Sequence, residues 1–496
     1  MPGPYDRTRR FLAPLTDDPE AATAQMAAVD IDLVAARLTP AAEIAVALTA
    51  TLLLRLDQAA PRLHLDIPAT RSTQLPRLGT GTLLDELAAE HAGFTSVERL
   101  DGRGSFDAAL RLVFDGDADG VRIDTAGWSC AIGESLPDVP GNPISAAFAA
   151  TLASAEVLKV ALRAAGSRAK MRPWRGVVSL WDYRLSPTVG PAVPDSIDLD
   201  GVAFAGCGGV ASAAAWALGL LQLTGAPLTV DHDVIDDTNP NRHLTASLAN
   251  VGDAKAGLLG ALLRLAGANP VVEAVQWEAL DSGRRSTVDL GVISVDDDAV
   301  RRAFQLDMPR LILNGGTSDS GLYQVTSHDF LTEACLGCIA RADLQSASAE
   351  ESLARRLGVQ LGELQPHLDS AEPLPCWLLA QLSPEDAGQL RGVPGREVAR
   401  VACGHLRSLP DEPAHSAPML SAAPGILLAA EIVKRQMAAD APLSAMTNMV
   451  ATSILTGPHQ RWALQRHKNS DCTCQDPAYR AFYQRRWGDA SPAGAS

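Results

Sequence analysis

The residues that could do chemistry gather around one glycine-rich turn. A short apolar run, Val202–Ala205, leads into Gly206-Cys207-Gly208-Gly209, then an Ala- and Leu-rich segment, a second apolar run and Asp231. Strand, glycine turn, helix, strand and acid in this order are typical of a dinucleotide-binding βαβ unit. Glycines let the backbone approach phosphate, and a helix N-terminus offers free N–H groups. We therefore expect Gly206, Gly208 and Gly209 to hold phosphate, and Asp231 to accept hydrogen bonds from ribose hydroxyls.

Further polar residues follow in a fixed order. Asn239-Pro-Asn-Arg242 comes just after the acids, and Lys255 follows it. The later stretch Leu290–Phe304 is expected to begin as a strand that runs into Asp296-Asp297-Asp298. Ligands of open α/β sheets bind at the carboxyl edge of the parallel strands, so these side chains should lie over one edge.

In this order and spacing the chain resembles the adenylyltransferase superfamily of ThiF, MoeB and the ubiquitin-activating enzymes. That family has a Gly-x-Gly-Gly-x-Gly turn, an acid at a strand end, an Asn-x-x-Arg element, a Lys and a later Asp. The matching residues are Gly206, Gly208, Gly209, Asp231, Asn239, Arg242, Lys255 and Asp297. The likeness covers residues 197–345 well and 415–475 loosely. The chain departs at Ala211, where the family usually has glycine, but alanine is small enough to keep the helix close to the strand.

The resemblance implies an ATP-dependent adenylyltransferase. A substrate carboxylate attacks the α-phosphorus of ATP, which gives an acyl adenylate and pyrophosphate. The resemblance assigns Arg242 and Lys255 to the phosphates and Asp297 to Mg²⁺, and it makes these three the catalytic residues. The implied partner is a ubiquitin-like or sulfur-carrier protein, or a peptide, with a flexible C-terminus. In several family members a partner subunit adds an arginine; here Arg184 or another N-terminal arginine could serve.

Two cysteine pairs form the second constellation. Cys335 and Cys338 follow the last strand of the unit, and Cys472 and Cys474 lie near the C-terminus. Four thiolates in two close pairs suit tetrahedral Zn²⁺, and the family frequently places a pair at each point. The second pair is Cys-x-Cys here, where the family usually has Cys-x-x-Cys. A redox role for Cys335 and Cys338 is the competing interpretation.

Cys403 is the candidate nucleophile. Some family members carry a thioester- or persulfide-forming cysteine in this region, and His405 stands close enough in sequence to act as its base. Cys376 is the second choice.

The pattern predicts an α/β protein whose Rossmann-like, mainly parallel sheet carries helices on both faces. We expect an N-terminal α/β domain at 1–195, an ATP-binding core at 196–345, an insertion at 346–416 and the rest of the adenylation domain at 417–490. Asn142–Leu162 and Ala417–Met437 share an Ala-Glu-aliphatic-aliphatic-Lys run. Either these are two Ala-rich helices of like composition, or the N-terminal half is a degenerate copy of the C-terminal one.

Composition narrows the class of protein. The 496 residues carry a formal net charge of −16, which argues against nucleic-acid binding by a general basic surface. Eight cysteines are few for this length and fit a reducing compartment, so we expect a cytoplasmic protein. The uncharged stretch Gly208–Leu228 is interpreted as a buried helix rather than a membrane span, and the N-terminus has no signal-peptide core. A homodimer is expected from the family.

Two alternatives stay open. A βαβ unit alone also permits a NAD(P)-dependent oxidoreductase, although Asn239, Arg242 and Lys255 have no role there. The other alternative is a non-catalytic nucleotide-binding scaffold, in which an inactive N-terminal copy serves as a recognition or dimerisation platform.

Overall fold

The computed structural model divides the chain into two compact units, Met1–Ala340 with Ser416–Ser496, and Arg341–His415. It describes residues 3–69, 75–102, 108–167, 171–318, 321–339, 353–354, 357–382, 387–388, 390–395, 398, 416–437, 447–470 and 472–488.

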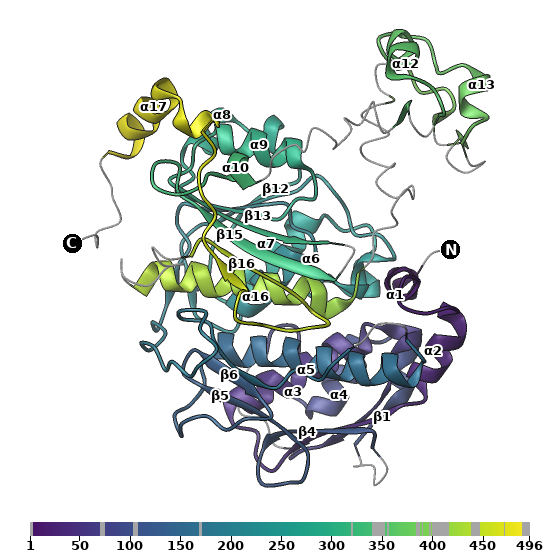
Figure 1. Ribbon diagram of the computed structural model, residues 1–496, viewed down its shortest axis with the longest axis vertical. Helices are drawn as coiled ribbons and strands as arrows, with labels where there is room; N and C mark the ends of the chain where they lie inside the picture. The colour runs from purple at the N-terminus through teal and green to yellow at the C-terminus, as the bar shows by residue number, and fades with distance from the viewer. Residues whose placement is uncertain are drawn as a thin grey trace. The chain divides into compact units, whose positions relative to one another are not determined.

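The N-terminal half of the first unit contains a seven-stranded sheet in the order β3-β2-β1-β4-β5-β6-β7 (Figure 1). The pairs from β3 to β5 are parallel, and β6 and β7 add antiparallel pairs. The strands are β1 (Asp30–Ala35), β2 (Arg62–Asp66), β3 (Leu100–Asp101), β4 (Leu110–Asp115), β5 (Val121–Ala126), β6 (Ser129–Ile132) and β7 (Gly176–Ser179).

The second half contains an eight-stranded sheet in the order β12-β11-β9-β13-β14-β15-β16-β17. Its pairs from β12 to β14 are parallel, and the remaining strands are antiparallel. The strands are β9 (Val202–Ala205), β11 (Leu228–Val230), β12 (Val271–Glu273), β13 (Leu290–Ile293), β14 (Leu311–Thr317), β15 (Leu322–His328), β16 (Met449–Ser453) and β17 (Ala463–Leu464). Up to its last strand, this sheet repeats the strand order and the strand directions of the first sheet. The fold is therefore mixed α/β with mainly parallel sheets.

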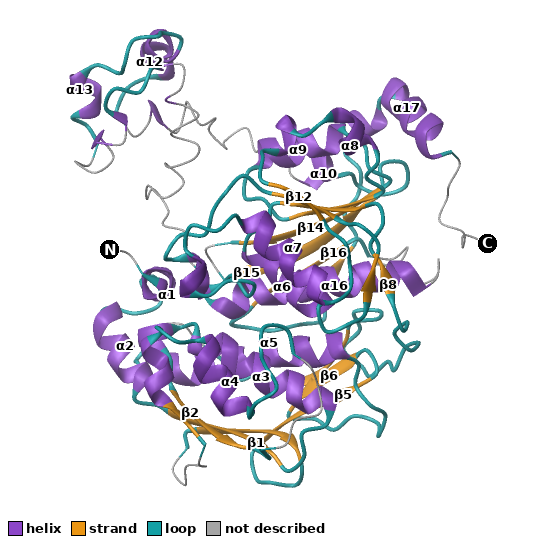
Figure 2. Cartoon of the chain, turned by 180° about the vertical axis from the view of Figure 1, so that it is seen from behind, coloured by secondary structure: helices purple, strands orange, loops and turns teal. Residues whose placement is uncertain are grey.

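Four helices form the centre of the layer between the two sheets (Figure 2). They are α3 (Pro40–Leu54), α5 (Pro143–Ala164), α6 (Gly209–Leu218) and α16 (Pro418–Met437). In each half the central strand, β1 or β9, leads into the helix α3 or α6. The long helix, α5 or α16, precedes the antiparallel strand β7 or β16. Helix α3 packs on α5, α6 packs on α16, and α5 contacts α16 across the centre.

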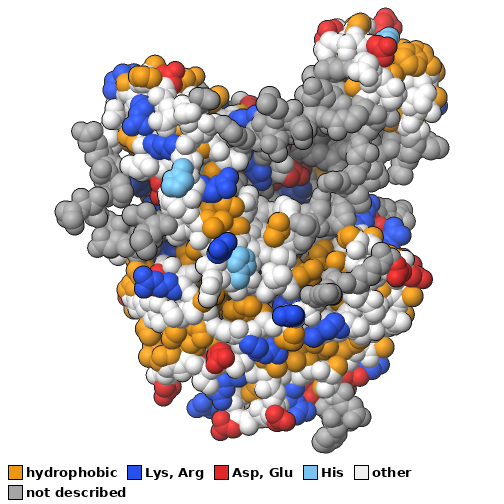
Figure 3. Space-filling model, viewed as in Figure 1, with side chains coloured by type: hydrophobic (Ala, Val, Ile, Leu, Met, Phe, Trp, Pro, Cys, Tyr) orange, Lys and Arg blue, Asp and Glu red, His pale blue; other side chains and the backbone are white. Residues whose placement is uncertain are grey.

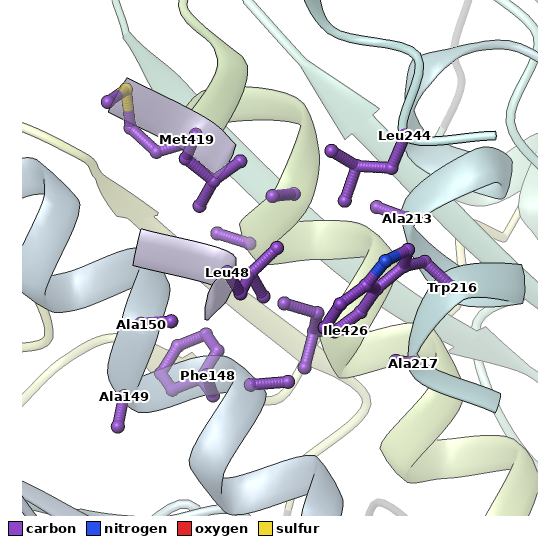
Figure 4. Close-up of a cluster of buried hydrophobic side chains, with 14 of the residues drawn as sticks. Leu48, Phe148, Ala149, Ala150, Ala213, Trp216, Ala217, Leu244, Met419 and Ile426 are labelled. Atoms are coloured by element: carbon purple, nitrogen blue, oxygen red, sulfur yellow. The ribbon is translucent and has the colours of Figure 1, made fainter. Parts of the chain in front are cut away.

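The core of the first unit lies in this helical layer. Figure 4 shows Leu48 of α3, Phe148 of α5, Trp216 of α6 and Ile426 of α16 meeting in one buried cluster. Gly425 allows the close approach of α16 to α6, since an added Cβ atom would stand 2.3 Å from the carbonyl oxygen of Val210. Burial of these apolar faces from both halves makes them one hydrophobic core.

Each of the two long helices contains a buried Glu–Lys ion pair whose partners lie one turn apart. In α5 the Lys159 Nζ lies 2.5 Å from Glu156 Oε1, and in α16 Lys434 pairs with Glu431. The Ala-Glu-aliphatic-aliphatic-Lys run therefore marks helices in corresponding places of the two halves.

By length and composition α5 could cross a membrane, but 94% of its apolar window is buried inside the structure.

The two halves differ on the outer face of each sheet. In the second half α9 (Asp298–Leu306) and η5 (Trp277–Ala279) cover it, with Trp277 and Phe304 in a second apolar cluster. In the first half residues 116–120 join β4 to β5 without a helix. The Asp32 carboxylate accepts two hydrogen bonds from Arg111 on this face. The first half thus has a short loop over a polar sheet face where the second half has a helix connection.

Short elements complete the first unit. They are α1 (Pro4–Leu12), α2 (Pro19–Ala27), α4 (Leu83–Glu90), α7 (Lys255–Leu265), α8 (Ser282–Ser286), α10 (Leu336–Ile339), α17 (Pro477–Trp487), β8 (Ile197–Asp198), β10 (Leu223–Thr224), and the 3-10 turns η1 (Asp57–Ala59), η2 (Thr95–Arg99), η3 (Asn239–Asn241), η4 (Leu248–Asn250) and η7 (Thr473–Gln475). On the face shown in Figure 3, basic side chains are interspersed with apolar and neutral ones rather than gathered into one patch.

The second unit has α12 (Leu361–Leu368) and α13 (Cys376–Leu379) around a small core of its own, which includes Leu364, Leu378 and Leu390. The expected boundaries at 195, 345 and 416 stay predictions.

Candidate nucleotide site and four-cysteine cluster

The glycine turn joins β9 to α6 at the carboxyl edge of the second sheet. Gly206 has a φ of 83°, which favours glycine, and α6 begins at Gly209 without a side-chain cap. The first N–H groups of α6 are therefore available to an anion, and the helix dipole favours one there. The predicted strand–glycine turn–helix arrangement is present at Gly206, Gly208 and Gly209.

Asp231 stands at the end of the neighbouring strand β11. Its carboxylate accepts hydrogen bonds from the backbone N–H of Cys207, at 2.6 Å, and of Asp233, at 2.8 Å. Burial raises the pKa of Asp231. The carboxylate thus braces the glycine turn and keeps lone pairs for a hydroxyl donor.

Arg242 lies directly over the turn. A Cβ atom on Gly209 would stand 3.0 Å from Arg242 Cγ, so a larger residue there would crowd this side chain. Nη1 of Arg242 is buried and has no hydrogen-bond partner among the described residues. Burial and then the neighbouring Arg7 lower the pKa of Arg242 to about 9, so the guanidinium is still charged at neutral pH. A buried, charged donor without a partner is costly and indicates a site for an anion.

Arg7 brings a second cation from α1, at the N-terminal end of the chain. Its Nε donates to Thr238 Oγ1 at 3.1 Å, and its pKa is lowered by burial. Arg184 is mostly exposed instead, with its Nε 3.7 Å from Asp182. The sequence left open which N-terminal arginine would serve. It did not single out Arg7, because the residues around the cluster Arg7-Thr-Arg-Arg10 show no motif.

Lys255 is the first residue of α7. Its Nζ donates to Asp233 Oδ2 at 2.8 Å, next to Asp231. Asn239 is buried at the start of η3. The structure thus places Arg242 at the glycine turn and Lys255 beside the end of β11, and the role expected for Asn239 stays a prediction.

Two acids face the arginine pair. Asp236 and Asp296 each raise the pKa values of Arg7 and Arg242 through their charges. Asp297 lies one residue further along, and its Oδ1 accepts from the N–H of Val300, at 3.3 Å, in the first turn of α9. The structure therefore brings Asp296 to the cations, and the role expected for Asp297 stays a prediction.

The two cysteine pairs come together from segments more than 130 residues apart. Sγ of Cys335 lies 3.4 Å from that of Cys472 and 3.8 Å from that of Cys338, and Cys338 lies 3.5 Å from Cys474. A tetrahedral ion with Zn–S bonds of about 2.3 Å needs sulfurs about 3.8 Å apart. The N–H of Asn469 also points to Cys338 Sγ, at 3.3 Å. The four-Cys cluster could therefore hold Zn²⁺.

The remaining cysteines divide by burial. Cys207 and Cys130 are buried, and desolvation raises the pKa of both thiols. Cys376 is exposed at the start of α13. Cys403 and His405 lie outside the described residues.

Comparisons with known proteins give the following. No protein-family model matches the chain. It is 25% identical over 391 residues to the uncharacterized protein y4jF of Sinorhizobium fredii, over 74% of this chain and 75% of that protein. The crystal structure of E. coli MccB covers 55% of this chain at 17% identity and a TM-score of 0.34, and the structure of E. coli MccB with AMPCPP and MccA covers 56% at 16% and 0.36. The chain spans 64% and 66% of those two chains. The similarity to the MccB structures thus extends over about half of the chain.

Proposed function

We propose that the protein is an ATP-dependent adenylyltransferase. It activates a C-terminal carboxylate of a ubiquitin-like or sulfur-carrier protein, or of a peptide, as an acyl adenylate and releases pyrophosphate. The observation that carries the proposal is the arginine pair over the glycine turn, with the unpaired Nη1 of Arg242 beside the free N-terminus of α6.

The arrangement suits the reaction because two anions must meet. The attacking carboxylate and the triphosphate repel each other, and the leaving pyrophosphate carries further charge. Arg242 and Arg7 stabilise the charge of the phosphates. The Asp231 carboxylate accepts hydrogen bonds from the ribose hydroxyls. Lys255 leaves its ion pair with Asp233 and binds phosphate instead. In this reaction the carboxylate oxygen forms a bond to the α-phosphorus, and the bond from that phosphorus to the pyrophosphate oxygen breaks.

Mg²⁺ would be held by an acid at the rim. The carboxylate donors present fit a hard cation. Asp296 is the better candidate than Asp297 because its charge acts on both arginines. The ion would neutralise phosphate charge when bound.

We further propose that the N-terminal half is a degenerate copy of the adenylation half. The equal strand order and the buried Glu-x-x-Lys pair in the corresponding helix support a duplication. At the place of the glycine turn this half has Arg37 ahead of α3, which starts at Pro40. Arg37 makes a two-pronged ion pair with Asp115. Nothing there resembles a phosphate cradle, so we assign nucleotide binding to the second half alone.

Calorimetry with ATP and with NAD(H) tests the proposal. ATP should bind to the wild-type protein, and Arg242→Met should bind it much more weakly. Tight NAD(H) binding without ATP binding would favour the oxidoreductase alternative, and binding of ATP without any turnover would favour the scaffold.

A further inference from the structure

The loop that carries Arg242 is held by an arginine from the other half of the chain. Arg55 follows α3 and is only 1% exposed. Its Nη1 donates to the carbonyl oxygens of Pro240 and His243, the latter at 3.1 Å, and its Nη2 donates to that of Ala246 at 3.0 Å. One guanidinium thus donates to three carbonyl groups of the loop, of which the His243 oxygen also accepts from the N–H of Ala246.

A second arginine and one acid complete this clamp. Glu90 Oε1 lies 3.6 Å from Nη2 of Arg55 and 2.7 Å from Nε of Arg77. Nη1 of Arg77 donates to the carbonyl oxygen of Thr245 at 2.5 Å. Burial lowers the pKa of Arg55 only to about 10, so the clamp is charged at neutral pH.

The opposite side of the same loop is bonded to the nucleotide site. His243 Nε2 donates to the carbonyl oxygen of Cys207 in the glycine turn, at 2.6 Å, and its Nδ1 accepts from Thr245 Oγ1, at 2.9 Å. Burial lowers the pKa of His243 to about 3, so the ring is neutral and this tautomer is the one that both bonds require. Leu244 anchors the loop in the core near Ala213 (Figure 4). Loop 240–246 therefore lies between Arg55 and the glycine turn.

We infer that Arg55 is a positioning residue that sets loop 240–246, and with it Arg242, over the glycine turn. This inference rests on the proposed adenylation. The N-terminal half, which has no phosphate cradle, thereby acts on the nucleotide site through Arg55. A guanidinium spreads its donors over a rigid planar fork, whereas a lysine ammonium carries its three donors on one nitrogen, so lysine is a poor replacement for Arg55.

The test compares Arg55→Lys with Arg111→Met in the full-length protein. Arg111 makes a partly buried ion pair with Asp32 far from the loop, so its loss costs folding stability without touching the site. ATP–pyrophosphate exchange should fall on the order of 10- to 100-fold in Arg55→Lys, because a small misplacement of a charged group costs this much. It should be unchanged in Arg111→Met, measured below the unfolding temperature of each variant.

A double-mutant comparison separates positioning from general destabilisation. Arg242→Met should reduce exchange by a much smaller factor in the Arg55→Lys background than in the wild type, since the two residues act through one loop. Equal factors in both backgrounds would overturn the inference. Hydrogen exchange of the 242–246 amides, which needs no activity, should be faster in Arg55→Lys and unchanged in Arg111→Met; unchanged protection in both would also overturn it. A wild-type protein without pyrophosphate exchange would instead refute the proposed function and leave the amide measurement to decide on Arg55.

Discussion

At the scale of single residues, the candidate site is defined by buried positive charge beside the glycine turn. Arg242 is held close to Gly209 and buries a donor without a partner. Arg7 stands next to it although like charges repel, and two acids at the rim reduce that cost. A bound anion would stabilise such an arrangement further, which is the role proposed for the phosphates of ATP.

The pKa of Arg242 gives a pH prediction. Because burial lowers it to about 9, the free protein loses this charge as the pH rises through 9, whereas an exposed arginine would stay protonated. ATP affinity should therefore fall between pH 8 and pH 10. Calorimetry across this range checks it, with Arg242→Met as control, whose weaker binding should lack this pH dependence.

The choice between two neighbouring acids gives a second prediction. Asp296→Asn should reduce Mg²⁺-dependent pyrophosphate exchange by on the order of 100-fold, since it removes a carboxylate that faces the phosphates. Asp297→Asn should have a smaller effect, because the Asp297 carboxylate accepts from the first turn of α9. The reverse ranking in exchange rates would restore the assignment of Asp297.

At the scale of elements, the ends of strands and the starts of helices supply the residues of the candidate site. The second sheet supplies the turn and the acids, and α1 supplies Arg7 from the far end of the sequence. The glycine turn, Asp231 and the Arg242 element could be placed from the sequence because strand, glycine and helix signals are local. Arg7 could not, since its role depends on α1 reaching η3, which no local pattern encodes.

The α1 helix gives a third prediction. Arg7→Gln should lower exchange by about tenfold or more through the loss of one phosphate cation. Arg9→Gln is the matched control on the same helix, because Arg9 is exposed and pairs with Asp6. Equal effects of the two variants would mean that α1 acts only through folding.

The four-Cys cluster gives a fourth prediction. The purified protein should carry one Zn²⁺ per chain, and Cys335→Ser should lose it and unfold at a lower temperature, because the ion ties α10 to η7. Cys376→Ser, at an exposed thiol outside the cluster, should keep both. Metal analysis and thermal unfolding check this; full zinc content in Cys335→Ser would contradict it.

At the scale of the whole first unit, two similar sheets share one helical core. The sequence echo between Asn142–Leu162 and Ala417–Met437 was the only trace of this repeat that could be found without a structure. Each of these helices buries a Glu-x-x-Lys pair that would be costly to break. The strand order of the first half could not be predicted, since its β4–β5 connection has no helix and its sheet face is polar.

The two halves contribute different parts. The second half holds the candidate nucleotide site. The first half places Arg7 next to Arg242 and holds loop 240–246 through Arg55 and Arg77. The contact between α5 and α16 joins the two halves within one chain. The homodimer expected from the family stays a prediction.

The most direct test of the central claim is ATP–pyrophosphate exchange by the wild-type protein. Candidate carrier proteins and peptides with a free C-terminal carboxylate are supplied, each beside its C-terminally amidated form. We predict exchange with at least one free carboxylate and none with its amide, and loss of that exchange in Arg242→Met. An equal rate of exchange with the free and the amidated C-terminus, or NAD(H) binding in place of ATP binding, would contradict the account.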